Sequence, residues 1–288
     1  MAFDPKGGTA TRTVPGQFGH SPFSHGGFLV AGEAAVWTSD AQSNLVRVDP
    51  RTGRRQTVPL HGVQNPVDGI AVGDGSVWVV RPADTFDQWF RIDPATLQVL
   101  HQYTLPVSFN QGENTGFGIE QGSVWSALGI QVVHIDTAAG KVTHVPMTAD
   151  ALSVGPDGVW VADSLHDAIR KLDAAGKPGP PVTVQGGIDG LVDQSGSLWV
   201  LQKFSGQVVQ VDPVRRQVVG NPIRVGSDPT SISAGLGAVW VTDSGGDLWR
   251  IDPVSATATP IHLGGQLTSA APDEVDKVVW VLVGGTKQ

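Results

Sequence analysis

The chain has 288 residues, 40% of them hydrophobic, with 19 basic and 27 acidic side chains, a net charge of −8 and no cysteine. The hydrophobic content can form a packed core and excludes a disordered chain, and without cysteine there is no disulfide, thiolate metal site or thiol nucleophile. The acidic balance excludes general nucleic-acid binding, which needs a basic surface. No apolar run approaches the roughly 20 residues of a membrane helix.

The N-terminal sequence, MAFDPKGGTA, has no apolar run typical of a signal peptide. The compartment is therefore left open. An origin as an extracytoplasmic domain cut from a larger bacterial protein is compatible with this terminus. We expect a monomer.

Seven of the nine tryptophans recur in one local pattern, of which GSVWV is typical, at spacings of 41, 47, 35, 39, 41 and 40 residues. A regular period of about 40 residues is the signature of a repeat architecture. Each of the first six units also carries an apolar-Asp pair at a predicted turn, as in VDPRTG at 48–53 and IDPATL at 92–97. Asp, Pro and Gly at these positions are typical of short hairpin loops. The seven tryptophans are Trp37, Trp78, Trp125, Trp160, Trp199, Trp240 and Trp280.

Each unit divides into four short strands, as the second unit shows. We expect strands at 69–73 (GIAVG), 76–80 (SVWVV), 89–93 (WFRID) and 98–105 (QVLHQYTL). Helical repeats are excluded because the apolar spacing lacks a helical period and turn signals recur too often. The chain is therefore predicted to be an all-β protein, a single seven-bladed β-propeller over 1–288 with four-stranded antiparallel blades. The basic residues before the turn aspartates, Arg47, Arg91 and Arg250, are predicted to face solvent.

The last unit ends too early to supply four strands. The segment 3–15 resembles 48–59, so we expect the last blade to be composite, from about 266–288 plus 1–15. Closure of the ring in this way leaves no open sheet edge. The alternative is six blades with a separate N-terminal hairpin.

The repeated pattern P-x-G-I-x-x-G-x-G-x-V-W-V followed by R-I-D-P-x-T resembles the YVTN/YncE and virginiamycin B lyase group of seven-bladed propellers over essentially the whole chain. For the lyase, the resemblance implies metal-assisted opening of a lactone ring by a histidine and a Glu-Pro-His motif in successive blades. Those positions fall on Thr230 and on Gln266-Leu267-Thr268 in this chain. None of these residues can act as the implied base.

In a propeller, the loops that lead into each first strand and those that leave each second strand lie on one face, here called the loop face. The lead-in positions hold carboxylates in five successive units, at Asp68, Glu113, Asp150, Asp189 and Asp228, and a histidine, His25, in the first. This pattern predicts an acidic channel mouth, because carboxylates that converge on an axis attract a cation or a basic ligand. Asp68, Glu113, Asp150 and Asp189 are the candidate ligands for Ca²⁺ or Mg²⁺. The alternative is that each aspartate only caps a turn.

The unit between Trp78 and Trp125 is six residues longer than the mean, with extra residues in 81–90 and 109–118. We expect both stretches on the loop face, where Trp89 and Phe109 would form an aromatic wall for a sugar, amine or peptide. The alternative is that Trp89 packs inside its blade. Ser164, between Asp163 and His166 on a loop that leaves a second strand, invites comparison with a catalytic triad, but neighbours in sequence seldom point at one another correctly.

Two functions remain open. The first is a non-catalytic binding or sensing domain for a small molecule, peptide or protein on the loop face, with no required cofactor. It is favoured by the absence of a catalytic residue set. The second is a metal-dependent lyase or lactone hydrolase that uses the acidic ring and His25.

Overall fold

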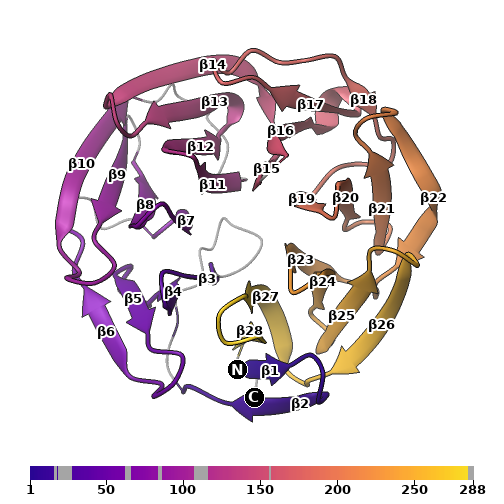
Figure 1. The fold of residues 1–288 in the computed structure, drawn as a ribbon, viewed down its shortest axis with the longest axis horizontal. Helices are drawn as coiled ribbons and strands as arrows, with labels where there is room; N and C mark the ends of the chain where they lie inside the picture. The colour runs from indigo at the N-terminus through magenta and orange to yellow at the C-terminus, as the bar shows by residue number, and fades with distance from the viewer. Residues whose placement is uncertain are drawn as a thin grey trace.

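The structure of the protein is a computed structural model, which describes residues 1–15, 18, 28–61, 66–83, 86–106, 116–155 and 157–284. Seven antiparallel four-stranded sheets, the blades, surround a central axis (Figure 1). This confirms the predicted seven-bladed propeller. Within the described ranges the one helical element is the short 3₁₀ helix η1 (Ser164–His166). It leaves no helix in those ranges long and apolar enough to cross a membrane.

The strands follow one another outward from the axis in each blade, with the first strand innermost. Blade 1 contains β3 (Val30–Gly32), β4 (Ala35–Ser39), β5 (Leu45–Val48) and β6 (Arg55–Val58), and blade 2 contains β7 (Gly69–Gly73), β8 (Ser76–Pro82), β9 (Phe86–Ile92) and β10 (Val99–Pro106). Blade 3 contains β11 (Gly116–Glu120), β12 (Ser123–Ala127), β13 (Gly129–Asp136) and β14 (Lys141–Ala149), and blade 4 contains β15 (Ala151–Gly155), β16 (Gly158–Asp163), β17 (Ala168–Leu172) and β18 (Val182–Thr183). Blade 5 contains β19 (Gly190–Gln194), β20 (Ser197–Gln202), β21 (Gln207–Asp212) and β22 (Gln217–Arg224), and blade 6 contains β23 (Pro229–Gly235), β24 (Ala238–Asp243), β25 (Asp247–Asp252) and β26 (Thr257–His262). Blade 7 contains β27 (Gln266–Asp273), β28 (Val278–Gly284), β1 (Ala2–Asp4) and β2 (Thr9–Arg12).

The ring closes as the sequence predicts, because β1 pairs with β28 in blade 7. Ala2 lies opposite Trp280, and the Met1 amino group donates a hydrogen bond to the Val281 carbonyl at 2.7 Å. The Val281 N–H donates in return to the Met1 carbonyl at 2.7 Å. Strands from the two ends of the chain therefore share one sheet (Figure 1), and the alternative of six blades with a separate hairpin is wrong.

Blade 2 departs from the predicted boundaries. We expected the second strand to end at 80 and the third to begin at 89, but β8 continues to Pro82 and β9 begins at Phe86. The added residues lengthen the pair of strands, with Val80 opposite Trp89 and Pro82 opposite Asp87. Residues 87–90 are buried and paired with β8, so the insertion extends the blade.

The core lies between the blades. All seven repeated tryptophans are buried, with at most 6% of the side chain exposed, and each hydrophobic cluster combines residues of neighbouring blades. A buried aromatic residue removes about 150–250 Å² from water, which at about 25 cal/mol per Å² amounts to roughly 4–6 kcal/mol for each tryptophan. The repeat therefore exists because every sheet needs one large apolar side chain to fill the wedge beside its neighbour.

A polar or basic side chain from the third strand covers several of these indoles, which corrects the expectation that these residues simply face solvent. Each is the direct cross-strand neighbour of its tryptophan, and contacts of this kind contribute about 0.5–1 kcal/mol at partly exposed sites. The pairs are Arg91 over Trp78 at 6.0 Å, Arg250 over Trp240 at 6.0 Å, Lys171 over Trp160 at 5.6 Å, and His134 stacked on Trp125 with ring centroids 3.9 Å apart.

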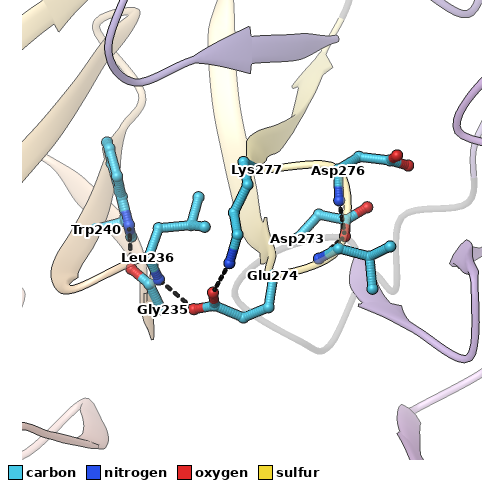
Figure 2. A network of polar contacts seen from close by, with 8 residues as sticks. Gly235, Leu236, Trp240, Asp273, Glu274, Asp276 and Lys277 are labelled. Atoms are coloured by element: carbon cyan, nitrogen blue, oxygen red, sulfur yellow. Dashed lines mark hydrogen bonds and ion pairs between the residues drawn. The ribbon is translucent and has the colours of Figure 1, made fainter.

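The opposite side of the ring from the loop face carries the tight turns between first and second strands and between third and fourth strands, and is called the turn face below. Carboxylates on these turns join neighbouring blades. Figure 2 shows one such junction, where Glu274 of blade 7 accepts a hydrogen bond from the Leu236 N–H of blade 6. Glu274 also forms an ion pair with Lys277 at 3.0 Å. The same type of bond runs from the Gly75 N–H to Glu33 at 2.9 Å and from the Gly122 N–H to Asp74 at 2.6 Å.

Candidate functional site

Three of the predicted lead-in aspartates occupy equivalent places. Asp68, Asp150 and Asp189 each come directly before the innermost strand of a blade. Their backbone N–H groups donate to a carbonyl near the end of the second strand at 2.8–2.9 Å, so each aspartate extends the sheet by one residue. The side chains are thereby held at the loop face, as the repeat predicts.

The carboxylates of Asp150 and Asp189 hold the loops that leave the second strands. Asp150 Oδ2 accepts hydrogen bonds from the Ser164 N–H at 2.7 Å and the Ser164 hydroxyl at 2.6 Å. Asp189 Oδ2 accepts from the Lys203 N–H at 2.7 Å. The partner lies fourteen residues later in both blades. This arrangement is the turn-capping role that the sequence left as an alternative.

Asp68 and Asp228 differ from Asp150 and Asp189 in the residues beside their side chains. At Asp68 the residue fourteen positions later is Pro82, which has no N–H to donate. Asp228 lies two residues farther from its tryptophan than the others, and its Oδ2 accepts from the Ser244 hydroxyl at 2.5 Å. Its own N–H donates to the carboxylate of Asp243 at 2.9 Å.

The described residues do not assemble the predicted metal site. No group of three or more His, Cys, Asp or Glu side chains in the described part of the chain could hold a metal ion. Asp68, Asp150 and Asp189 thus sit at equivalent positions without converging. The remaining predicted ligand, Glu113, and the predicted ligand-binding residues His25 and Phe109 lie outside the described residues.

Trp89 does not form the expected aromatic wall. Its side chain is fully buried in β9, and its ring meets the edge of Phe117 at 5.2 Å between centroids. Blade 3 therefore covers Trp89, which is the alternative that the sequence left open. Its neighbour Asp87 is buried too, and burial raises the pKa of that carboxyl to about 6.

Ser164, Asp163 and His166 do not form a triad. Asp163 caps η1 and its Oδ2 contacts His166 Nδ1 at 2.7 Å, as a triad would require. The Ser164 hydroxyl instead donates to Asp150, away from the imidazole. A nucleophile must lie within hydrogen-bond reach of its base, so these residues serve loop structure.

A lysine compensates part of the acidic ring. Burial lowers the pKa of the Lys203 ammonium below that of an ordinary lysine, while the carboxylates of Asp189 and Asp228 act in the opposite direction. Lys203 therefore carries its charge between acidic side chains of blades 5 and 6. The channel mouth is less acidic than a count of aspartates suggests.

The loop face also presents an apolar arc that the sequence analysis missed. Ile130, Leu165 and Phe204 each lie five residues after the tryptophan of blades 3, 4 and 5. Their exposed fractions are 52%, 76% and 102%, and they lie in β13, in η1 and in the turn between β20 and β21, respectively. Because these blades are consecutive in the ring (Figure 1), the three exposed side chains belong to adjacent blades. The tryptophan register could have revealed this signal.

The positions that the lyase resemblance singles out are neighbours in space. The Thr230 hydroxyl donates to the Leu267 carbonyl at 2.9 Å and lies 2.6 Å from the Thr242 hydroxyl. The Thr268 hydroxyl makes a long bond of 3.4 Å to the Leu282 carbonyl. A threonine hydroxyl is too weakly basic to act as a general base near neutral pH, so the implied base is missing at these positions.

Solved structures of other proteins share this architecture. Virginiamycin B lyase from Staphylococcus aureus superimposes with a TM-score of 0.74 at 16% identity, covering 90% of this chain and 92% of that chain. A catalytically inactive histidine-to-alanine variant of the same enzyme with quinupristin gives 0.74 and 16%, covering 98% and 94%. The chain shares the propeller fold of virginiamycin B lyase.

That likeness concerns the fold alone. A chain of the mitotic checkpoint complex gives nearly the same TM-score, 0.72, at 12% identity over 96% of this chain and 92% of its own. No family model matches the sequence, and no curated protein matches it. Function must therefore be argued from the loop face itself, since propellers support many unrelated activities.

Proposed function

We propose that the protein is a non-catalytic binding domain that holds a peptide segment of a partner on its loop face. The observation that carries the proposal is the apolar arc of Ile130, Leu165 and Phe204 on three consecutive blades. Exposed apolar side chains gathered on a rigid scaffold are typical of interaction sites. The bonds from Asp150 and Asp189 to the adjoining loops supply that rigidity at blades 4 and 5.

The charges beside the arc favour a peptide over a purely apolar ligand. Asp163 and His166 lie beside Leu165, and Lys203 precedes Phe204. A peptide offers apolar side chains for the arc together with N–H and C=O groups for these polar neighbours. The proposal requires no metal and no cofactor.

A peptide library displayed on phage tests this function. Binders are selected on the wild-type protein, and the affinity of a selected peptide is measured by fluorescence anisotropy. Phe204→Ser should weaken binding about tenfold or more, as truncation of an apolar anchor does. Val254→Ser is the matched control, because Val254 is 92% exposed on the turn face. Peptides that bind Phe204→Ser and wild type equally would refute the proposal.

The alternative function is a metal-dependent lyase or lactone hydrolase, favoured by the structural likeness to virginiamycin B lyase. It makes two different predictions. Millimolar Ca²⁺ or Mg²⁺ should raise the unfolding midpoint, and Asp189→Asn should abolish the rise. Chromatography should also detect ring opening of quinupristin in the presence of the metal. Neither effect is expected of the binding domain.

A further inference from the structure

Blade 4 has an incomplete outer edge. Its fourth strand, β18, has two residues and pairs only with Ala168 and Ile169 of β17, whereas the fourth strands of the other blades have four to nine residues. Between β17 and β18 the chain runs through the proline-rich sequence KPGPP at 177–181. Proline has no N–H to continue a sheet, so the turn-face half of β17 has no fourth strand beside it. The chain there makes only an isolated bridge between Leu172 and Pro178 and a hydrogen bond from the Gly179 N–H to the Lys171 carbonyl at 2.7 Å.

A groove of about 850 Å³ opens at this place, between blades 4 and 5. Trp160 lies at its base, and Pro178 and Val214 belong to its walls. Val214 is 88% exposed. The volume falls within the range of about 300–1,000 Å³ that is typical of small-molecule sites. An indole, a proline and a valine together favour a flat apolar ligand.

The groove also concentrates positive charge in a chain that is acidic overall. Lys171, Lys177 and Arg216 line it, together with two aspartates, Asp157 and Asp173. The carboxylate of Asp173 is already occupied, because it accepts hydrogen bonds from two N–H groups of its own turn at 2.9 Å. Three cations therefore face two carboxylates in the groove, a positive balance that favours an anionic ligand.

Lys171 is set apart from its counterparts in other blades. At the same repeat position, Arg91 and Gln210 donate to a serine hydroxyl two residues before the tryptophan, both at 3.0 Å. Blade 4 has Gly158 in place of that serine, with a φ of +104°. A Cβ there would lie 2.8 Å from Lys171 Cε, so the glycine makes room for the lysine side chain over Trp160. Among the described residues the Lys171 ammonium forms no hydrogen bond and no ion pair within 4 Å.

The indole of Trp160 also lacks a bond that other blades have. The Nε1–H groups of Trp37 and Trp240 donate to the carbonyl five residues earlier, both at 3.0 Å. Among the described residues, the corresponding donor of Trp160 is buried without a partner. The ring at the base of the groove is therefore held by packing and by the contact with Lys171.

We propose that this groove binds a small anionic amphiphile, a planar aromatic body that carries one carboxylate or sulfonate. The aromatic body lies against Trp160 and Val214, and the acid group lies between Lys171 and Arg216. Charge-assisted hydrogen bonds to lysine and arginine favour such an anion over a neutral analogue of equal size. The groove belongs to the turn face, so this inference is independent of the peptide site.

Isothermal titration calorimetry with 2-naphthoate tests the proposal on the intact chain. Val214→Asp places a carboxylate in the groove at an exposed position, and Val254→Asp is its matched control at the same turn position of blade 6, where Val254 is 92% exposed. We expect saturable binding to wild type and to Val254→Asp, and about tenfold weaker binding to Val214→Asp and to Lys171→Met. Near-ultraviolet circular dichroism of each variant checks that the fold is retained.

A neutral probe and a loop-face variant complete the test. 2-Naphthalenemethanol should bind at least tenfold more weakly than 2-naphthoate, and Phe204→Ser should bind 2-naphthoate as wild type does. Absence of saturable binding at millimolar 2-naphthoate would overturn the proposal. So would equal binding by Val214→Asp and Val254→Asp, or equal affinity for the alcohol and the acid.

Discussion

Replacement of Asp193 by asparagine should make the protein more stable near neutral pH. Asp193 lies next to the last residue of β19, the first strand of blade 5, beside an axial cavity of about 750 Å³. Burial, with the neighbouring Asp157 and Glu120, raises the pKa of its carboxyl to about 6, while Lys171 opposes the rise. In the unfolded chain the pKa returns to 3.8. The folded protein therefore binds this proton more tightly than the unfolded protein does.

The sign of the pH dependence follows from that difference. Between pH 4 and 6 the folded state holds a proton that the unfolded state has lost, so the free energy of unfolding rises as the pH falls through 6. Two pH units correspond to about 3 kcal/mol at 1.36 kcal/mol per unit. Because Asp193 is only partly buried, screening by solvent reduces this to about 1–2 kcal/mol.

Urea unfolding of wild type and Asp193→Asn at several pH values measures the effect. Above pH 7 the variant should be about 1–2 kcal/mol more stable than wild type, and the difference should shrink through pH 6 and vanish near pH 4. Asp93→Asn is the control of opposite sign, since hydrogen bonds from the Thr96 and Ala95 N–H groups lower the pKa of Asp93. A variant no more stable than wild type at pH 7.5, or a difference independent of pH, would refute the reasoning.

Three further substitutions test the packing and the loop supports by thermal or urea unfolding. Gly116→Ala should destabilise by about 1–3 kcal/mol, since its Cβ would lie 2.5 Å from Leu152 Cβ and 2.6 Å from the Leu152 N; an unchanged midpoint would contradict this. Arg81→Met should cost about 2–3 kcal/mol, because the buried guanidinium donates to two carbonyls of blade 1, and a neutral result would show that water replaces it. Asp150→Ala should cost about 1–2 kcal/mol through the two lost bonds from Ser164, whereas Asp150→Asn should lose less.

The blade count, the strand order and the ring closure could be predicted because they depend on local periodicity. Each of the seven repeated tryptophans marks the second strand of a blade, and the Asp-Pro turns mark the end of the third. The start of β9 at Phe86, three residues before the predicted start, was missed because the extra residues before Trp89 carry no part of the repeated pattern. A tryptophan out of register can belong to a loop or to a longer strand, and only the pairing with β8 decides between them.

The candidate site was less accessible to prediction. The sequence places aspartates at the loop face but does not show that the carboxylates of Asp150 and Asp189 accept from residues fourteen positions later. Such partners depend on the register and curvature of two strands. The apolar arc was different, because Ile130, Leu165 and Phe204 each follow a repeated tryptophan by five residues in the sequence. The tryptophan register alone is therefore enough to find these three apolar residues.

The composite blade has a consequence for the order in which the molecule can be made. Met1 and Val281 exchange two backbone hydrogen bonds across 280 residues of chain. During synthesis β1 and β2 therefore emerge first and find their sheet only when β28 has left the ribosome. Until then the nascent protein is an open arc of blades, with the apolar face that Trp280 later covers still exposed to solvent. Assembly of blade 7 is thus the last step in forming the propeller, and the interval before it is when the unfinished ring is most vulnerable to aggregation.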